Sequence, residues 1–249
     1  PAELEDLART HRALAEIRAP KTPVVAARND DYNTTLYVAT DDMPHIVSSL
    51  TAYLSAHFGG FLAIFHPIFL AERNTDGKLI SLRGTGTRAN LASGDTAAVG
   101  MPSLQLSEGA PEGSTVTIES WIAIRLTRYL NEDDLRLLEH EVRRVLADVY
   151  ACYTDLEGMV TAVFDISQAM YELRGATLGH GEESYAANPR GVEPASRVEV
   201  AQDFLRWLTR GNFVFMGVKE RVLDGTSGAI SLVDRPGSAL GILRTTEGK

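Results

Sequence analysis

The chain has 249 residues, of which 44% are hydrophobic, and it carries a formal net charge of −9. This length and composition suit one large or two ordinary globular domains with an apolar core. The acidic balance argues against nucleic acid or anionic lipid as a partner, because both bind through basic surfaces. A single cysteine excludes an internal disulfide framework. We see no signal peptide and no long apolar run, which predicts a cytoplasmic protein without a membrane partner.

The first part of the chain predicts a helix, a buried strand and a second helix. Apolar residues at helical spacing predict a leading helix, and residues 1–33 are assigned to this helix and a linker. The run TTLYVAT, residues 34–40, is rich in β-branched and aromatic residues, as in a buried strand. The helix after it ends at the glycine pair 59–60, and Pro44 is expected in its first turn.

The turn between this strand and this helix, TDDMPHI, is the candidate binding site. Backbone N–H groups at a helix start lack partners inside the helix, and the helix dipole favours negative charge there. An amino-acid effector at this turn would contact the residues Asp41, Asp42, Met43, Pro44, His45 and Ile46. Pro44 removes one donor, however, and the two aspartates place negative charge beside the others. In the alternative interpretation the turn is structural, and the Asp42 side chain caps the helix.

The middle of the chain predicts a broken strand, a hairpin, an insertion and a central strand. Residues 61–73 form an extended run interrupted at His66-Pro67, which places this point at a sheet edge or bulge. The sequence TDGK then turns the chain into a hairpin. Residues 84–113 lack periodic apolar residues and are predicted to be a flexible insertion. Order returns with the strand around Trp121, which we expect to be buried.

The second half of the chain is predicted to be mainly helical. Asn131 caps a helix with an acidic first turn, and a second long helix follows or continues it. After a linker over residues 176–196, a helix containing Trp207, which is expected to pack inside, leads to paired strands within NFVFMGVKERVL and AISLVD. The predicted domains are therefore 34–175 and a second small α+β unit over 197–249.

The sequence contains no recognisable catalytic, cofactor-binding or metal-binding motif. The segment RGTGTRANLASG lacks the third glycine of GxGxxG and a Walker-type Lys-Ser/Thr pair. The histidines do not occur at metal-ligand spacing with one another or with Cys152. Neither TSG nor PGSALG supplies the GxSxG of a nucleophile elbow. We therefore expect no catalytic residue, no metal and no cofactor in this segment.

Several segments, in order, resemble the amino-terminal region of the large bacterial NAD-specific glutamate dehydrogenases. They are TDDMPHIVSSLTAYL, HPIFLAERNTDGKL, ESWIAIRLTR and FLRWLTRGNFVFMGVKERVL followed by GSALGILR. The resemblance implies an α+β fold, with an ACT-like (ferredoxin-like) sheet and helices followed by a second, partial α+β unit. The ACT unit is βαββαβ, and the helix predicted after Val149 leaves its final strand unassigned. His45 stands where the ligand turn of ACT domains typically has glycine.

The function implied by the resemblance is that of one segment of a larger enzyme. The parent oxidises L-glutamate with NAD and water to 2-oxoglutarate, ammonia and NADH, whereas this segment is expected to be non-catalytic, with a role in regulation and assembly. The chain begins at Pro1 rather than Met, so the rest of the parent polypeptide is an expected partner, as is a second copy in a homo-oligomer. Two alternatives stay open: an amino-acid-sensing module at residues 41–46, and a free-standing enzyme with an unrecognised site.

Overall fold

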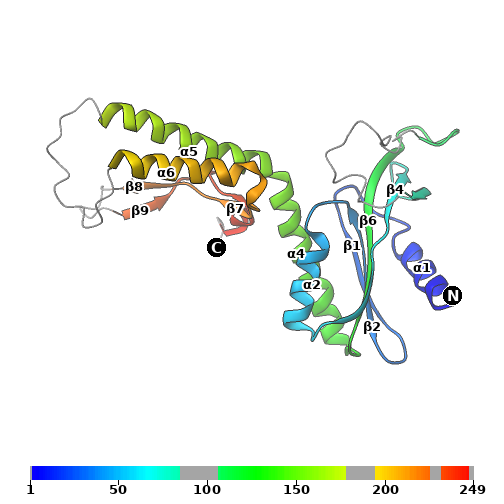
Figure 1. The fold of residues 1–249 in the computed structure, drawn as a ribbon. Coiled ribbons are helices and arrows are strands. Elements are labelled where there is room, and N and C mark those ends of the chain that lie inside the picture. The colour runs from blue at the N-terminus through cyan, green and yellow to red at the C-terminus, as the bar shows by residue number, and fades with distance from the viewer. Residues whose placement is uncertain (1, 85–105, 178–193, 225–230, 247–249) are drawn as a thin grey trace. The chain divides into compact units, whose positions relative to one another are not determined.

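The computed structural model describes residues 2–84, 106–177, 194–224 and 231–246 (Figure 1). The chain divides into two compact units, Pro1–Val149 and Tyr150–Lys249. Each unit combines helices with antiparallel strand pairs, so the fold is α+β, as predicted. The division falls inside the segment 34–175 that the sequence assigns to one domain. The reason is that α5 (Leu156–Thr177) packs against α6 (Pro194–Trp207) within the second unit.

The first unit is built on a six-stranded antiparallel sheet. Its strands follow the spatial order β1-β2-β6-β4-β5, and β3 and β4 pair with successive parts of β6. The break between β3 and β4 falls at His66-Pro67, as the proline predicts. The strand bounds are β1 Val24–Asn29, β2 Thr34–Asp41, β3 Phe61–Phe65, β4 Ile68–Arg73, β5 Leu79–Gly84 and β6 Thr115–Leu126.

Helices cover both faces of this sheet (Figure 1). α2 (Ile46–His57) and the first turns of α4 (Glu132–Thr154) lie on one face, and α1 (Ala2–Leu14) lies on the other. Alternate residues of a strand point to opposite faces, which explains why all but the last residue of β2 are buried. The core on the α2 and α4 face consists of Leu36, Val38, Ile122, Ile124, Leu50, Leu54, Leu138, Val142 and Leu146.

Strand β1 fills the sheet position that the ACT-like unit leaves open. In a βαββαβ unit the last strand lies antiparallel beside the first, and here that neighbour of β2 is β1. This strand was not predicted from the sequence, because residues 1–33 were assigned to a helix and a linker. The segment VVAARN has few of the β-branched and aromatic residues that mark a strand. No strand was predicted after Val149 to complete the ACT-like sheet. Its position beside β2 is filled by β1, which precedes β2 in the chain.

The prediction that two long helices follow one another is confirmed. The Asn131 side-chain oxygen accepts a hydrogen bond from the Asp134 N–H at 2.9 Å, which caps α4 as expected. α4 ends at Thr154, and α5 begins at Leu156 after the single residue Asp155. Asp155 accepts a hydrogen bond from the Gly241 N–H at 2.8 Å and thereby ties this junction to the end of the described chain.

The second unit contains α6, a π-helical turn, two small sheets and a 3₁₀ helix. Its apolar cluster is formed by Met159, Val163 and Phe215. The predicted pairing of strands within NFVFMGVKERVL and AISLVD is confirmed for residues 221–224 and 231–234, although residues 213–216 lie in no strand. The prediction that Trp207 packs inside is wrong, because this side chain is 48% exposed. Trp207 stacks on Phe204, its neighbour one turn earlier. The remaining bounds are Leu208–Asn212, β7 Gly217–Val218, β8 Arg221–Asp224, β9 Ser231–Asp234, β10 Leu240–Gly241 and Ile242–Thr246.

Two predicted segments lie largely outside the described residues. Of the predicted insertion 84–113, residues 85–105 are not described, and of the predicted linker 176–196, residues 178–193 are not described. In the ranges that are described, no helix combines the length and apolar character needed to cross a membrane.

Candidate functional site

The turn after β2 places its two acidic side chains on opposite faces of the sheet. Asp41, the last residue of β2, stands in register with Glu119 of β6. Asp42 continues the extended chain, and its N–H donates to the Ile118 carbonyl at 2.9 Å. Successive side chains of extended backbone point in opposite directions. The two carboxylates therefore cannot work together as an acid–base pair.

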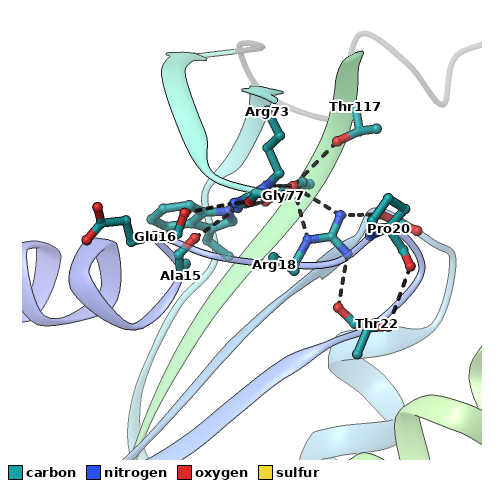
Figure 2. A network of polar contacts seen from close by, with 11 residues as sticks. Ala15, Glu16, Arg18, Pro20, Thr22, Arg73, Gly77 and Thr117 are labelled. Atoms are coloured by element: carbon teal, nitrogen blue, oxygen red, sulfur yellow. Dashed lines mark hydrogen bonds and ion pairs between the residues drawn. The ribbon is translucent and has the colours of Figure 1, made fainter. Parts of the chain in front are cut away.

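Asp41 belongs to a buried ion network on the α1 face. It accepts a hydrogen bond from Nη2 of Arg18, a residue that is only 3% exposed. The same guanidinium donates through Nε to Glu119 Oε1 at 3.1 Å and through Nη1 to the Thr22 carbonyl at 3.3 Å. Arg18 thus ties the segment between α1 and β1 to the end of β2 and to an interior residue of β6 (Figure 2).

Arg73 completes the network from the end of β4. Its Nε lies 2.7 Å from Oε1 of Glu119 and its Nη2 lies 3.0 Å from Oε2, a bidentate pair. Its other donors reach the carbonyl oxygens of Ala15 at 3.0 Å and Gly77 at 2.9 Å (Figure 2). Trp121 donates its indole N–H to Glu119 Oε2 at 2.9 Å. The Glu119 carboxylate is therefore saturated by donors from three segments.

The electrostatics of the network favour an ionised Glu119. Burial acts to raise the pKa of this carboxyl, but the hydrogen bond from Arg73, the charge of Arg18 and the hydrogen bond from Trp121 together lower it below its ordinary value. Two guanidinium groups face two carboxylates, those of Glu119 and Asp41, so the formal charges balance. A buried charge that is paired and fully hydrogen-bonded is stable in place. We interpret this network as structural rather than catalytic.

Asp42 takes part in a second hydrogen-bonded chain, on the opposite face. The Ser120 hydroxyl donates to Asp42 Oδ1 at 2.6 Å, and His66 Nε2 lies 2.9 Å from the same hydroxyl oxygen. Because the hydroxyl proton is directed to Asp42, His66 acts as a donor to Ser120. A catalytic serine would instead need the histidine to accept its proton, and Ser120 is fully buried. The three side chains link the turn, β6 and the β3–β4 break.

The other residues of the candidate site alternate between buried and exposed positions. Met43 and Ile46 are buried, whereas Pro44 and His45 are exposed. His45 is the N-cap residue of α2 and has a φ of 67°, in the left-handed region that favours glycine. The backbone at this position therefore has a conformation that the typical ACT glycine would adopt without strain, and histidine is among the residues that tolerate it better than most.

Two expectations about the start of α2 are wrong. The helix begins at Ile46, so Pro44 precedes it and does not lie in its first turn. No side chain caps the helix, because the Asp42 carboxylate is directed to Ser120 instead. The structure thus brings Asp41 and Asp42 into separate hydrogen-bonded networks and leaves only Pro44 and His45 of the candidate site exposed to solvent.

The roles of Arg18, Arg73 and Glu119 were not predicted from the sequence. The one local signal was a glutamate inside the apolar strand segment ESWIAI, since an unpaired carboxylate does not remain buried there. Its partners lie 101 and 46 positions away along the chain, beyond the reach of any local pattern. In the part of the chain that the structure describes, no group of three histidine, cysteine or carboxylate side chains could hold a metal ion.

Comparison with known proteins places these features in a family. Residues 1–142, more than half of the chain, match the protein-family model for the glutamate dehydrogenase ACT1 domain. The chain is 28% identical over 233 residues to the NAD-specific glutamate dehydrogenase of Halomonas elongata and 25% identical over 245 residues to that of Mycobacterium tuberculosis. These alignments cover 90% and 96% of this chain but only 12% of each relative. The chain therefore belongs to the glutamate dehydrogenase ACT1-domain family.

Proposed function

We propose that this chain is a non-catalytic regulatory and assembly segment of an NAD-specific glutamate dehydrogenase. The observation that carries the proposal is the ACT1-domain match over residues 1–142. The parent enzyme converts L-glutamate, NAD and water to 2-oxoglutarate, ammonia and NADH, with NAD bound outside this segment. The segment would then contact the rest of the parent polypeptide. We place the parent enzyme in the cytoplasm.

The saturation of the polar groups at the turn supports a non-catalytic role. Glu119 is held by two guanidinium groups and an indole N–H, and the Ser120 hydroxyl is buried and directed to Asp42. Catalysis needs a group that can reach a substrate and exchange a proton with it. Neither the Glu119 carboxylate nor the Ser120 hydroxyl meets this requirement.

An edge strand of the sheet supports the assembly role. Among the described strands, β3 pairs with β6 alone, and its Leu62 is 60% exposed. An edge strand with an exposed apolar side chain is a surface on which a second chain can pair. We expect Leu62→Lys to weaken self-association in sedimentation experiments. The control is Leu137→Lys on α4, where the leucine is 50% exposed; equal self-association of both variants would contradict this surface.

Effector binding at residues 41–46 is the second candidate function. The left-handed conformation of His45 and the lack of a side-chain cap on α2 favour it, because an anion can then approach the first-turn N–H groups. Amino-acid binding that strengthens in His45→Gly and disappears in Asp42→Ala would support this candidate. Binding that neither substitution changes would contradict it.

The size of the native polypeptide tests the main proposal. An antibody raised against this chain should detect, in an extract of the native organism, a polypeptide several times larger than the 27.1 kDa of the chain. The reason is that the chain spans only 12% of each relative. A native species of the same mass as the chain would overturn the proposal.

A further inference from the structure

Charged side chains close one lateral edge of the sheet in the first unit. Among the described strands, β1 pairs with β2 alone and is therefore an edge strand. In an antiparallel pair, the N–H and C=O groups of successive residues point alternately towards the partner strand and away from it. The outward groups of an edge strand can pair with a strand of another chain unless other groups occupy them.

Two side chains of α4 occupy outward groups of β1. The Ala27 N–H donates to Oε1 of Glu139 at 2.9 Å, and Nη2 of Arg143 donates to the Val25 carbonyl oxygen at 2.7 Å. Glu139 and Arg143 lie one helical turn apart, so both side chains reach the same edge from one face of α4. A carboxylate thus replaces the acceptor, and a guanidinium the donor, that a neighbouring strand would supply.

A third charged side chain joins this contact from β1 itself. Nη1 of Arg28 donates to the Ala27 carbonyl oxygen at 2.8 Å and lies 3.9 Å from Oε1 of Glu139. On its other side, Glu139 Oε2 accepts a hydrogen bond from Nη2 of Arg143 at 3.2 Å. The carboxylate therefore lies between two guanidinium groups, and we call Arg28, Glu139 and Arg143 the edge clamp.

The edge clamp covers backbone groups that have lost their water. Val25 and Ala27 are buried, whereas the clamp side chains of Glu139 and Arg143 are 25% and 48% exposed. A buried N–H or C=O group without a partner is costly, so these groups need either the clamp or a strand. Removal of the clamp would leave them in need of a new partner.

The sheet has a second lateral side, opposite to β1. Ile124 of β6 pairs with Leu36 of β2 on one side and with Ile64 of β3 on the other. β3, the edge strand with the exposed Leu62, therefore lies across the sheet from β1. A sheet that pairs on both sides can add copies without a natural end, whereas one closed side limits strand pairing to a single contact per copy.

We propose that the edge clamp prevents β1 from pairing with β1 of a second copy, which confines strand pairing between copies to the other side of the sheet. Such a β1–β1 contact would be two-fold symmetric, because each copy presents the same outward groups. The proposal rests on the assembly role proposed above and adds the edge that is excluded from it.

Removal of both α4 side chains tests the clamp. The variant Glu139→Ala, Arg143→Ala frees the Ala27 N–H and the Val25 carbonyl, and sedimentation of the 249-residue chain should then show species of roughly twice the wild-type mass, increasing with protein concentration. Equal sedimentation of this variant and the wild type would overturn the proposal.

A second ion pair on the same helix supplies the matched control. Glu141 and Arg144 of α4 bind each other at 2.6 Å, and Glu141 accepts a hydrogen bond from Tyr53 of α2 rather than from β1. The variant Glu141→Ala, Arg144→Ala removes the same two charges from α4 and should sediment like the wild type. Self-association of this control as strong as that of the clamp variant would contradict a specific role of the clamp.

Hydrogen exchange of the Ala27 amide locates the new contact. In the clamp variant at low protein concentration, this amide should exchange about tenfold faster than in the wild type, the equivalent of one lost hydrogen bond. At high concentration the exchange should slow again, because a strand of the second copy replaces Glu139. Self-association without this concentration-dependent protection would place the contact elsewhere and overturn the proposal.

Single substitutions keep the test decisive if the double variant does not fold. Glu139→Ala opens the Ala27 N–H alone and should show the same two effects, whereas Glu139→Gln keeps an acceptor and should sediment like the wild type. Equal self-association of Glu139→Gln and Glu139→Ala would contradict closure of the edge by hydrogen bonding. Failure of the clamp would leave the size of the native polypeptide, which tests the proposed function, unaffected.

Discussion

Glu119 joins three segments that are far apart in the sequence. Arg18 approaches it from the segment between α1 and β1, Arg73 from the end of β4 and Trp121 from its own strand. A buried ion without partners loses several kcal/mol of hydration free energy. The network removes that penalty only when all members are present, so the first unit depends on them jointly.

Replacing the central carboxylate should therefore destabilise the protein strongly. We expect Glu119→Gln to lower the free energy of unfolding by about 3–5 kcal/mol, because the buried Arg73 guanidinium loses its counter-charge and Arg18 keeps only that of Asp41. The control is Glu112→Gln, the same substitution at an exposed residue. Urea unfolding of the two variants measures the difference. A loss as small as that of the control would mean that the network contributes little to stability.

His11 gives the first unit a stability that depends on pH. It is 5% exposed, its Nε2 lies 3.0 Å from the Val38 carbonyl, and burial lowers its pKa from 6.5 to about 4, against the opposing effect of that hydrogen bond. Between these two values the unfolded chain binds a proton that the folded chain does not. The free energy of unfolding therefore falls as the pH drops from about 6.5 to about 4.

Substitution of His11 should remove this dependence. Between about pH 7 and pH 5 the wild type should lose about 2 kcal/mol more stability than His11→Gln, which has no titrating ring and keeps a donor. His140→Gln, at an exposed position of α4, should behave like the wild type. Equal pH slopes for wild type and His11→Gln would show that His11 is protonated in the folded state.

Part of the candidate site was predictable from local rules. Extended backbone directs successive side chains to opposite faces, so the sequence TDD already separates Asp41 from Asp42. The partners of these residues were not predictable, because Arg18, Ser120 and His66 reach the turn through strand pairings made between distant segments.

At the scale of elements, the β4–β5 hairpin packs closely against the segment after α1. The Arg18 N–H donates to the Gly77 carbonyl at 3.0 Å, and the Leu79 N–H donates to the Glu16 carbonyl at 2.8 Å. Gly77 has a φ of +76°, and a Cβ atom there would lie 2.3 Å from the Arg18 carbonyl oxygen. A side chain at this position would push the hairpin away from Arg18 and disturb the ion network.

Alanine at this glycine separates crowding from backbone strain. Gly109 also has a φ of +76°, but a Cβ atom there would meet no other atom within 4 Å. Gly109→Ala should therefore lose about 1 kcal/mol from the left-handed backbone alone, and Gly77→Ala should lose distinctly more. Thermal unfolding of both variants makes the comparison. Equal losses of stability in the two variants would mean that the backbone around Arg18 shifts to accommodate the added Cβ atom without a loss of free energy.

The elements that local patterns predicted correctly have strong periodicity or clear boundaries. The break at His66-Pro67 follows from a missing backbone donor, and the start of α4 follows from the Asn131 cap. β1 was missed because its alanines carry little strand preference. Trp207 was misplaced because an apolar stripe on a helix does not specify what covers it, and this side chain is half exposed.

At the scale of the whole molecule, the order of the elements alone does not specify the topology. The predicted order strand, helix, hairpin and helix fits an ACT-like unit whose last strand should follow α4. Instead, the described chain continues from α4 into α5, and β1 supplies the edge of the sheet beside β2. The backbone groups on the open side of β2 need a neighbouring strand to pair with. A strand that precedes the unit in the chain can supply this pairing as well as one that follows it.

We proposed that this chain is a non-catalytic part of a glutamate dehydrogenase, and enzyme activity tests this proposal. The most direct measurement is NADH formation from L-glutamate and NAD, made on the purified chain and on the native polypeptide captured with an antibody against it. We expect no turnover by the chain and clear turnover by the captured polypeptide. Turnover by the chain that survives repurification, or a captured polypeptide without activity, would contradict the claim.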